Sequence, residues 1–298
     1  MVVEQPKKPH VYEESTQYKH WRFSSKQLWN MRNENNKEAI TRVRRIVQEE
    51  QDANKESKTD DKEYLSPKEE LALCRFYEKQ LQFMSRHCKF PNVVMATAIA
   101  YMKRFFLNNT VMDYHPKDIR LTCLFLATKA EGERISIKEF GEKLRLPNVN
   151  SVLDLEFTVS QGLKFEYYVH HPYRPAYGFF LDLQQSESVD LNTLKDTYSK
   201  VEKILADIIL SDLPLIYQPS QLALAAFISA GEENGFDQRV KDYITDKFGN
   251  NAATLLNIIN KIVHQIKEFK PVTQDEAKKI DYKLKRCKNP AMNPESTM

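Results

Sequence analysis

One lysine stands at the end of an unusually apolar helix. In the stretch LTCLFLATKAEGER, residues 121–134, Thr122 is the only polar side chain among the first seven residues, and Lys129 comes directly after Thr128. A helix that is apolar on every side must be enclosed by other helices. Thr122, Leu126 and Lys129 share one helical face, so we expect Lys129 to lie at the rim of that face, on a rigid support.

A glutamate interrupts the apolar face of another predicted helix, at residues 150–164. The apolar stripe of that helix consists of Val152, Leu155, Val159 and Leu163. Glu156 falls within or beside this stripe, where a carboxylate is costly unless it is paired. If the two helices are neighbours, Lys129 and Glu156 flank one apolar groove. Otherwise Lys129 complements its helix dipole and reaches solvent, while Glu156 pairs locally.

Patterns typical of catalysis or of metal binding are missing. The sequence has no glycine-rich phosphate loop, no G-x-S-x-G and no H-E-x-x-H. The adjacent His170 and His171 point in different directions and have no Cys or acidic partner at ligand spacing, so we interpret them as a turn leading into PYRP. The sequence therefore predicts no enzyme, no metal site and no cofactor.

Composition narrows the function classes further. The 298 residues include 44 basic and 41 acidic side chains, a net charge of +3, which argues against a dedicated nucleic-acid or membrane surface. No apolar run reaches the ~20 residues needed to span a bilayer, so we expect an intracellular protein without a membrane segment. None of the four cysteines has a partner at metal-ligand spacing, and Cys74 and Cys123 fit helix cores, as expected in a reducing compartment.

An internal repeat indicates the architecture. YHP at residues 114–116 recurs as YQP at 217–219, and GLK at 162–164 recurs as QIK at 265–267, both with an offset of 103. With only seven glycines in the chain, each copy is predicted to be five helices, one of them central and apolar on all sides. The predicted helices are 67–87, 91–108, 116–131, 136–145 and 150–164, then 173–184, 191–211, 219–233, 237–247 and 251–268.

Helix starts and flanking segments complete an all-α organisation. Capping boxes are predicted at Ser24/Gln27, Ser66/Glu69, Ser136/Glu139, Ser151/Asp154 and Thr273/Glu276. Flanking helices are expected at 25–47 and 273–287, with a flexible charged connector over 48–63. The two tryptophans, Trp21 and Trp29, are expected to pack on the protein's own body. The chain is therefore predicted to consist of an N-terminal segment (1–66), the first repeat (67–166), the second repeat (167–270) and a C-terminal helix with its tail (271–298).

These features resemble the cyclin family. KAEGER falls where cyclins carry a Lys-x-Glu-Glu-like segment, and LDLEF falls where they carry a helix-five glutamate. The resemblance implies two tandem cyclin boxes and a regulatory subunit that stabilises the active αC-helix conformation of a cyclin-dependent kinase. The kinase-binding residues that it implies are Lys129, Glu156, Phe165, Leu126 and Thr122. Phe165 has an alternative role, packing in the linker to the second repeat. Gly132 departs from the family pattern, in which an acidic residue is usual.

Longer stretches narrow the resemblance to one branch of the family. These stretches are YKHWRFSS, KRFFLNNTVMDYHP, HHPYRPAYGFFLDL, IYQPSQLALAA and YKLKRC. Members of this branch are regulatory subunits of the CDK-activating kinase, which also acts in transcription factor IIH. The resemblance implies a nuclear protein whose partners are a kinase of the CDK-activating type, a RING-finger assembly subunit and the transcription factor IIH core. It implies no membrane and no direct nucleic-acid contact.

Two further expectations follow from family comparison. Cell-cycle cyclins dock Arg-x-Leu peptides on an apolar patch, but aligning the arginine of that patch with Arg75 places Cys74 and Glu78 at its apolar positions, so such docking is not expected. The alternative reading is a IIB-type general transcription factor with cyclin-like repeats. Such a factor needs phosphate-facing basic clusters and typically a zinc ribbon, and the sequence has no paired Cys-x-x-Cys.

Overall fold

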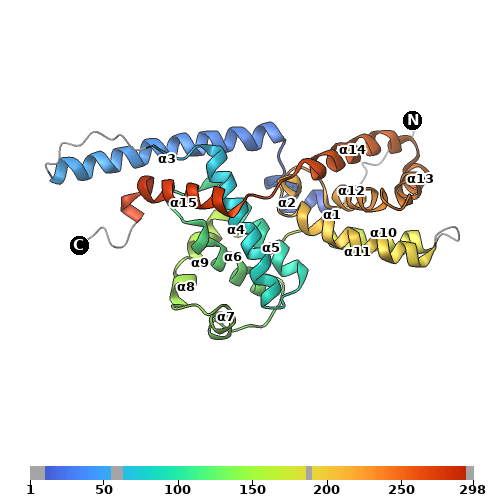
Figure 1. The fold of residues 1–298 in the computed structure, drawn as a ribbon, viewed down its shortest axis with the longest axis horizontal. Helices are drawn as coiled ribbons and strands as arrows, with labels where there is room; N and C mark the ends of the chain where they lie inside the picture. The colour runs from blue at the N-terminus through green and yellow to red at the C-terminus, as the bar shows by residue number, and fades with distance from the viewer. Residues whose placement is uncertain (1–10, 55–62, 186–189, 293–298) are drawn as a thin grey trace, which may run out of the picture. The chain divides into compact units, whose positions relative to one another are not determined.

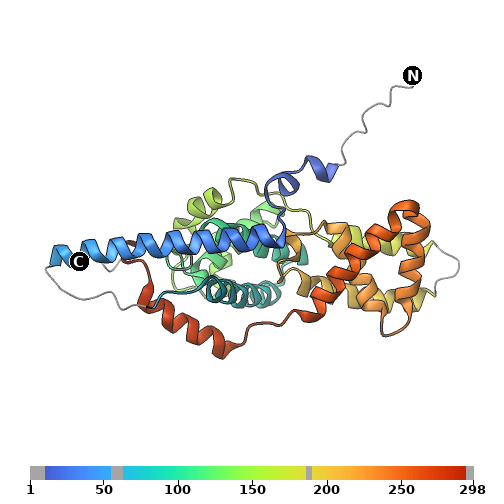
Figure 2. The ribbon, with the colours of Figure 1, turned by 90° about the horizontal axis from the view of Figure 1, so that it is seen from above.

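The computed structural model describes residues 11–54, 63–185 and 190–292, and in these ranges it contains helices and no strand (Figures 1 and 2). The predicted all-α class is confirmed. None of the described helices is long and apolar enough to cross a membrane. The described residues form two compact units, and each unit holds one of the predicted repeats.

The first-repeat unit comprises described residues 25–54, 63–167, 209–211 and 265–292. Its helices are α3 (Ser25–Asn54), α4 (Pro67–His87), α5 (Asn92–Asn108), α6 (Pro116–Ala130), α7 (Ile137–Leu144), α8 (Asn150–Asp154), α9 (Glu156–Gly162), α15 (Gln274–Cys287) and the 3-10 turn η3 (Pro290–Met292). Helix α6 is the predicted central helix: α4, α5, α8 and α9 all pack against it, and its residues from Thr122 to Thr128 are all buried.

The second-repeat unit comprises described residues 11–24, 168–185, 190–208 and 212–264. Its helices are α1 (Val11–Glu14), α2 (Thr16–His20), α10 (Tyr173–Gln184), α11 (Leu191–Ile208), α12 (Pro219–Gly231), α13 (Phe236–Phe248) and α14 (Ala252–Glu268), with 3-10 turns η1 (Leu213–Leu215) and η2 (Gly249–Asn251). The apolar helix α12 packs against α10, α11 and α13 and corresponds to α6. Residues 265–268 of α14 group with the other unit.

The N-terminal segment is divided between the two units. Trp21 is 2 % exposed in the second-repeat unit, as expected, whereas Trp29 on α3 remains 37 % exposed. Gln17 pairs with the backbone of His170, accepting from its N–H at 2.7 Å and donating to its carbonyl at 3.2 Å. His170 is thus part of a packed turn, and the described residues contain no cluster of ligands that could hold a metal.

Capping boxes form at two of the predicted helix starts. Ser66 and Ser136 each accept from the backbone N–H three residues on, and the glutamate at that position accepts from the backbone of the serine. Thr273 accepts from the Glu276 N–H. The box predicted at Ser151 is wrong, because the Ser151 hydroxyl donates to the carbonyl of Asn148 instead.

The helix predicted over 150–164 is interrupted at Leu155, so that α8 and α9 are separate. Beside this interruption the Thr122 hydroxyl of α6 donates a 3.0 Å hydrogen bond to the carbonyl of Val152. In a continuous helix this carbonyl would accept from the N–H of Glu156. The interruption therefore places Glu156 in the first turn of a new helix, where a carboxylate complements the helix dipole.

Helix α3 is longer than predicted. It continues to Asn54, so the expectation of a flexible connector beginning at residue 48 is wrong for 48–54, and 55–62 lie outside the described residues. Burial of Val43 and Val47 supplies an apolar face. Side-chain pairs spaced four apart, including Gln48 with Asp52, support the end of the helix.

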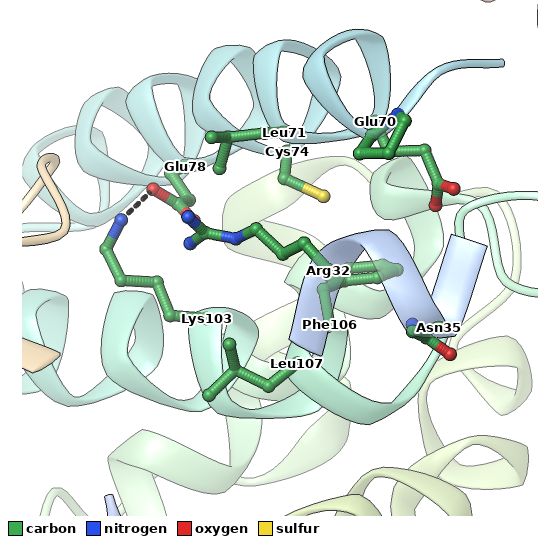
Figure 3. A pocket seen from close by; sticks show the side chains of 10 residues that line it. Arg32, Asn35, Glu70, Leu71, Cys74, Glu78, Lys103, Phe106 and Leu107 are labelled. Carbon is green, nitrogen blue, oxygen red and sulfur yellow. Dashed lines mark hydrogen bonds and ion pairs between the residues drawn. The ribbon is translucent and has the colours of Figure 1, made fainter. Parts of the chain in front are cut away.

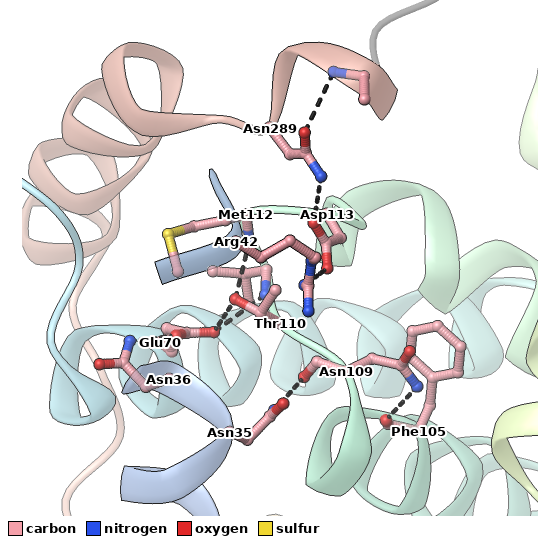
Figure 4. A network of polar contacts seen from close by, with 12 residues as sticks. Asn35, Asn36, Arg42, Glu70, Phe105, Asn109, Thr110, Met112, Asp113 and Asn289 are labelled. Atoms are coloured by element: carbon pink, nitrogen blue, oxygen red, sulfur yellow. Dashed lines mark hydrogen bonds and ion pairs between the residues drawn. The ribbon is translucent and has the colours of Figure 1, made fainter. Parts of the chain in front are cut away.

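The loop after α5 holds both flanking elements to the first repeat (Figure 4). From α3, Asn35 donates to the carbonyl of Asn109 at 3.0 Å, and Arg42 forms an ion pair with Asp113. From the C-terminal segment, the Asn289 side chain donates to the second carboxylate oxygen of Asp113 at 2.7 Å. A single five-residue loop, 109–113, therefore carries contacts from the two ends of the unit.

Glu70 of α4 supports the same loop from inside. Its carboxylate accepts from Asn36 at 2.5 Å, from Thr110 at 2.8 Å and from the N–H of Val111 at 3.0 Å. Burial raises the pKa of Glu70, and these three donors oppose the rise by stabilising the charged form. A buried carboxylate with several donors fixes the position of the loop more firmly than apolar contact alone.

His115 links the start of α6 to α15. Its Nδ1 accepts from the backbone N–H of Lys117 at 3.0 Å, and its Nε2 lies 3.2 Å from Asp281. Burial lowers the pKa of His115; Asp281 and Asp118 oppose this effect, whereas Lys288 adds to it. Because Nδ1 serves as an acceptor, the neutral imidazole is the form that caps α6.

We predict that this histidine makes the first-repeat unit less stable in mild acid. The folded-state pKa lies below the unfolded value of about 6.5, so its contribution is complete above pH 6.5 and is lost as the pH falls toward the folded value. His115→Asn keeps a capping acceptor and removes the titration. Its free energy of unfolding should fall less than that of the wild type between pH 7.5 and 5.5; equal losses would show that other groups cause the decline.

Candidate partner-binding site

The structure brings Lys129 and Glu156 together. The Nζ of Lys129, in the last turn of α6, lies 2.5 Å from Oε1 of Glu156, at the start of α9. Their side chains are 47 % and 28 % exposed, and the Lys129 ammonium also lies 4.5 Å from the ring centroid of Phe125. The pair is therefore preorganised at the surface, with charged atoms that a partner can reach.

The end of α6 explains the glycine at residue 132. Gly132 has φ +79°, its N–H donates to the carbonyl of Lys129, and the N–H of Glu133 donates to the carbonyl of Thr128. This pair of bonds is a Schellman motif, in which the left-handed residue is usually glycine. Glu131 accepts from the Thr97 hydroxyl at 2.5 Å and so faces its own unit. The motif turns the chain sharply just beyond Lys129 and keeps that lysine at the helix rim.

Two of the five expected contact residues do not reach the surface. Thr122 is fully buried and Leu126 is 5 % exposed, so the expectation that both touch a partner needs correction. Thr122 instead donates to the Val152 carbonyl of α8. Thr122 therefore links α6 to α8, and Leu126 is part of the buried core.

Two exposed phenylalanines lie near the two ends of α9, the helix that begins with Glu156. Phe165 is 54 % exposed and Phe157 is 65 % exposed, and their ring centroids lie 6.1 Å apart. Phe157 directly follows Glu156 and was not among the predicted residues; its exposure depends on where α9 begins, which the sequence pattern alone did not show.

The backbone at Phe165 is strained. Lys164 and Phe165 have φ of +54° and +57°, a left-handed conformation that is rare for bulky residues. Such conformations cluster at functional sites, because surrounding structure must maintain them. Here the conformation keeps the Phe165 ring beside Phe157. We use the name α6–α9 surface for the four residues Lys129, Glu156, Phe157 and Phe165.

A second charge pair in this unit is structural. Glu78 of α4 and Lys103 of α5 are joined at 2.6 Å with side chains only 2 % and 4 % exposed, and Lys103 also donates to the carbonyl of Leu210 at 3.1 Å. A cavity of about 40 Å³ adjoins the pair, and Arg32 of α3 points into it (Figure 3). Burial raises the pKa of the Cys74 thiol that lines the cavity, which keeps this thiol protonated at neutral pH.

The Glu78–Lys103 pair and helix α3 lie where a peptide groove on α4 would have to form. An apolar peptide groove on α4 requires apolar side chains at the surface, whereas Glu78 is engaged with Lys103 and α3 passes over the same face (Figure 3). The α6–α9 surface combines an accessible ion pair with two exposed aromatic rings. Such a combination suits protein recognition, in which aromatic anchors supply most of the binding energy.

Comparison with known families identifies both repeats. Residues 45–167 match the model described as "Cyclin, N-terminal domain", and residues 171–274 match "Cyclin C-terminal domain". Cyclin CCL1 of Saccharomyces cerevisiae is 32 % identical over 94 % of this chain and 82 % of its own. Cyclin-H of Xenopus laevis is 30 % identical over 93 % of this chain and 87 % of its own.

Two solved structures are also similar. A chain of the CAK complex from Chaetomium thermophilum bound to ATP-γ-S has a TM-score of 0.84 and 29 % identity, covering 94 % of this chain and 89 % of that chain. A chain of the yeast TFIIK (Kin28/Ccl1/Tfb3) complex has a TM-score of 0.69 and 34 % identity, covering 86 % of this chain and all of that chain. The matched domains are cyclin domains, which favours a cyclin over the IIB-type alternative.

We predict that Glu78 and Lys103 stabilise the unit only as a pair. Lys103→Met leaves a buried carboxylate without its ammonium and should lower the free energy of unfolding by about 3–5 kcal/mol. Combining it with Glu78→Leu should restore much of that loss. Denaturant unfolding of the single and double variants tests this, with Arg45→Gln, from the exposed pair with Glu49, as the control expected to cost under about 1 kcal/mol. Equal losses in the single and double variants would contradict it.

Proposed function

Because this chain belongs to the cyclin family, we propose that it is the regulatory subunit of a cyclin-dependent kinase of the CDK-activating type, acting also within transcription factor IIH. The relatives that support this are a cyclin H and Ccl1, and the similar structures are described as a CAK complex and as TFIIK. The substrates are then other kinases and the C-terminal domain of RNA polymerase II, and the partner performs the chemistry.

The α6–α9 surface is the observation that carries the proposal. Lys129 and Glu156 are paired on a rigid support, and the exposed Phe165 lies 6.1 Å, between ring centroids, from Phe157, which directly follows Glu156. A subunit activates a kinase only by binding its active conformation more tightly than the inactive one. In kinases that conformation places the αC-helix glutamate against the strand-three lysine. Shifting the kinase from mostly inactive to mostly active needs about 5 kcal/mol of differential affinity, within reach of a desolvated ion pair with aromatic anchors.

The remaining partners and the location follow from the same assignment. The TFIIK structure contains Kin28, Ccl1 and Tfb3, so the relative Ccl1 stands in a complex with two other proteins. For this chain we propose a kinase and a RING-finger assembly subunit as direct partners, the transcription factor IIH core as the larger assembly, and the nucleus as the location. No cofactor is part of this function.

We predict that Lys129→Ala combined with Glu156→Ala leaves the fold intact and weakens kinase binding by about 30-fold or more, because both charges would be lost from a desolvated contact. Calorimetric titration with the purified kinase measures the affinity, and phosphorylation of an activation-loop substrate measures activation. The chain alone should show no kinase activity.

The matched control for this variant is Lys200→Ala combined with Glu233→Ala, an exposed pair at 2.6 Å in the second-repeat unit. That variant should bind the kinase as the wild type does. Wild-type affinity and activation in the Lys129 and Glu156 variant would disprove the proposed site.

A second prediction separates binding from packing at Phe165. Glycine adopts the left-handed conformation without strain, so Phe165→Gly should keep or slightly raise the melting temperature. Loss of the exposed ring should weaken kinase binding by about tenfold. Lys164→Gly makes the same backbone change one residue earlier and should retain affinity. If Phe165→Gly lowers stability and leaves affinity unchanged, the ring serves the linker to the second repeat.

A further inference from the structure

The backbone that follows Phe165 is hydrogen-bonded to two buried side chains of α5. The guanidinium of Arg104 donates to the carbonyl of Glu166 at 2.9 Å, and the hydroxyl of Tyr101 donates to the carbonyl of Tyr167 at 2.6 Å. The exposed fractions of Arg104 and Tyr101 are 2 % and 0 %. Because they are three residues apart in one helix, they share a face of α5. One rigid helix therefore holds two consecutive carbonyls of the linker.

We propose that Tyr101 and Arg104 are positioning residues, which hold the Phe165 ring in the place from which it contacts the kinase. The inference rests on the proposed function, in which Phe165 is an aromatic anchor. Helix α5 carries none of the four residues of the α6–α9 surface. Neither Tyr101 nor Arg104 is accessible to a partner, so an effect of either residue on kinase binding has to pass through the backbone that it holds.

The linker needs such support because its backbone is strained. Lys164 and Phe165 are consecutive residues with side chains, and both have positive φ. Conformations of this kind persist only where the surrounding structure maintains them. The N–H of Phe165 donates to the carbonyl of Ser160 at 2.9 Å, which fixes the start of the turn. The two donors of α5 fix the carbonyls that come directly after it.

Gly162 supplies an independent observation that α5 lies directly against the end of α9. A Cβ at this position would lie 2.6 Å from the ring of Phe105 and 3.3 Å from the side-chain nitrogen of Asn109. Phe105 is fully buried and follows Arg104 on α5. Glycine therefore permits an approach that any side chain would prevent. This approach brings the linker within hydrogen-bonding distance of the α5 donors.

Both donors are permanent at neutral pH. Burial raises the pKa of the Tyr101 hydroxyl, which therefore stays protonated, and the guanidinium of Arg104 is always charged. The ring of Tyr101 also meets the ring of Tyr167 edge-on, with centroids 6.2 Å apart. A buried donor that lost its acceptor would carry the full cost of its desolvation. The linker carbonyls are consequently held in place before any partner binds, which reduces the entropy that Phe165 loses on binding.

A double-mutant cycle separates positioning from stability. Tyr101→Phe removes the hydroxyl and keeps the buried ring, so it should weaken kinase binding by about three- to tenfold. In a Phe165→Ala background the anchor is already missing, and the same change should leave kinase affinity unaltered. Calorimetric titration of the full chain with the organism's own counterpart of Kin28 measures affinity, and the melting temperature of each variant is recorded beside it.

Arg104→Met provides a second cycle. It removes the guanidinium and keeps an aliphatic side chain, and it should weaken kinase binding by about tenfold, again only while Phe165 is present. The melting temperature should fall in both backgrounds, because the Glu166 carbonyl loses a donor in each. If Arg104→Met does not fold, the Tyr101→Phe cycle decides the question alone.

Tyr77→Phe is the matched control. It removes another buried tyrosine hydroxyl of the same unit, which donates to Asp281 of α15 at 2.9 Å. This variant should lower the melting temperature and leave kinase affinity unchanged. Wild-type affinity in Tyr101→Phe, or a loss of affinity that persists in the Phe165→Ala background, would overturn the inference while the proposed function stands. If the wild-type chain binds no kinase, the proposed function fails and the inference fails with it.

Discussion

The enclosure of α6 is the constraint on which the first-repeat unit depends. Its apolar surface extends around the whole helix, so four other helices must pack against it and their positions are set by its side chains. Because α6 cannot move without disrupting these contacts, Lys129 at its last turn has a fixed place. The hydroxyl of Thr122, inside the same helix, donates to the Val152 carbonyl and so ties α6 to α8, which precedes α9. One enclosed helix thus positions both members of the ion pair.

The two lysine–glutamate pairs of this unit illustrate how burial separates structure from recognition. Glu78 and Lys103 are almost wholly buried, and each compensates the desolvation of the other. Lys129 and Glu156 have similar geometry but remain accessible, so a partner can replace or extend their contact. Both pairs consist of the same two residue types, one lysine and one glutamate. The difference arises from depth in the fold, which decides whether removing a charge affects stability or binding.

The flanking helices are fixed parts of the cyclin framework. Residues 109–113 receive hydrogen bonds or ion pairs from α3 and from the C-terminal segment, and the buried Glu70 supports them from below. Polar contacts of this kind specify one arrangement, because each unsatisfied group would carry a desolvation cost. The result is that α3 passes over the α4 face beside Glu78.

Local sequence patterns predicted the helical class, the two repeats, the central helices and the capping of α4 and α7, since these depend on periodicity and on contacts three or four residues apart. They also identified Lys129 and Glu156, because a charge within an apolar pattern is visible in one dimension. Packing between helices, in contrast, makes Thr122 and Leu126 internal, and the folded chain shows the break at Leu155, the extension of α3 to Asn54 and the exposure of Phe157. Each of these depends on a neighbour distant in sequence or on the burial of one helical face. A hydrogen bond such as that from Thr122 to Val152, spanning 30 residues, leaves no periodic signal in the chain.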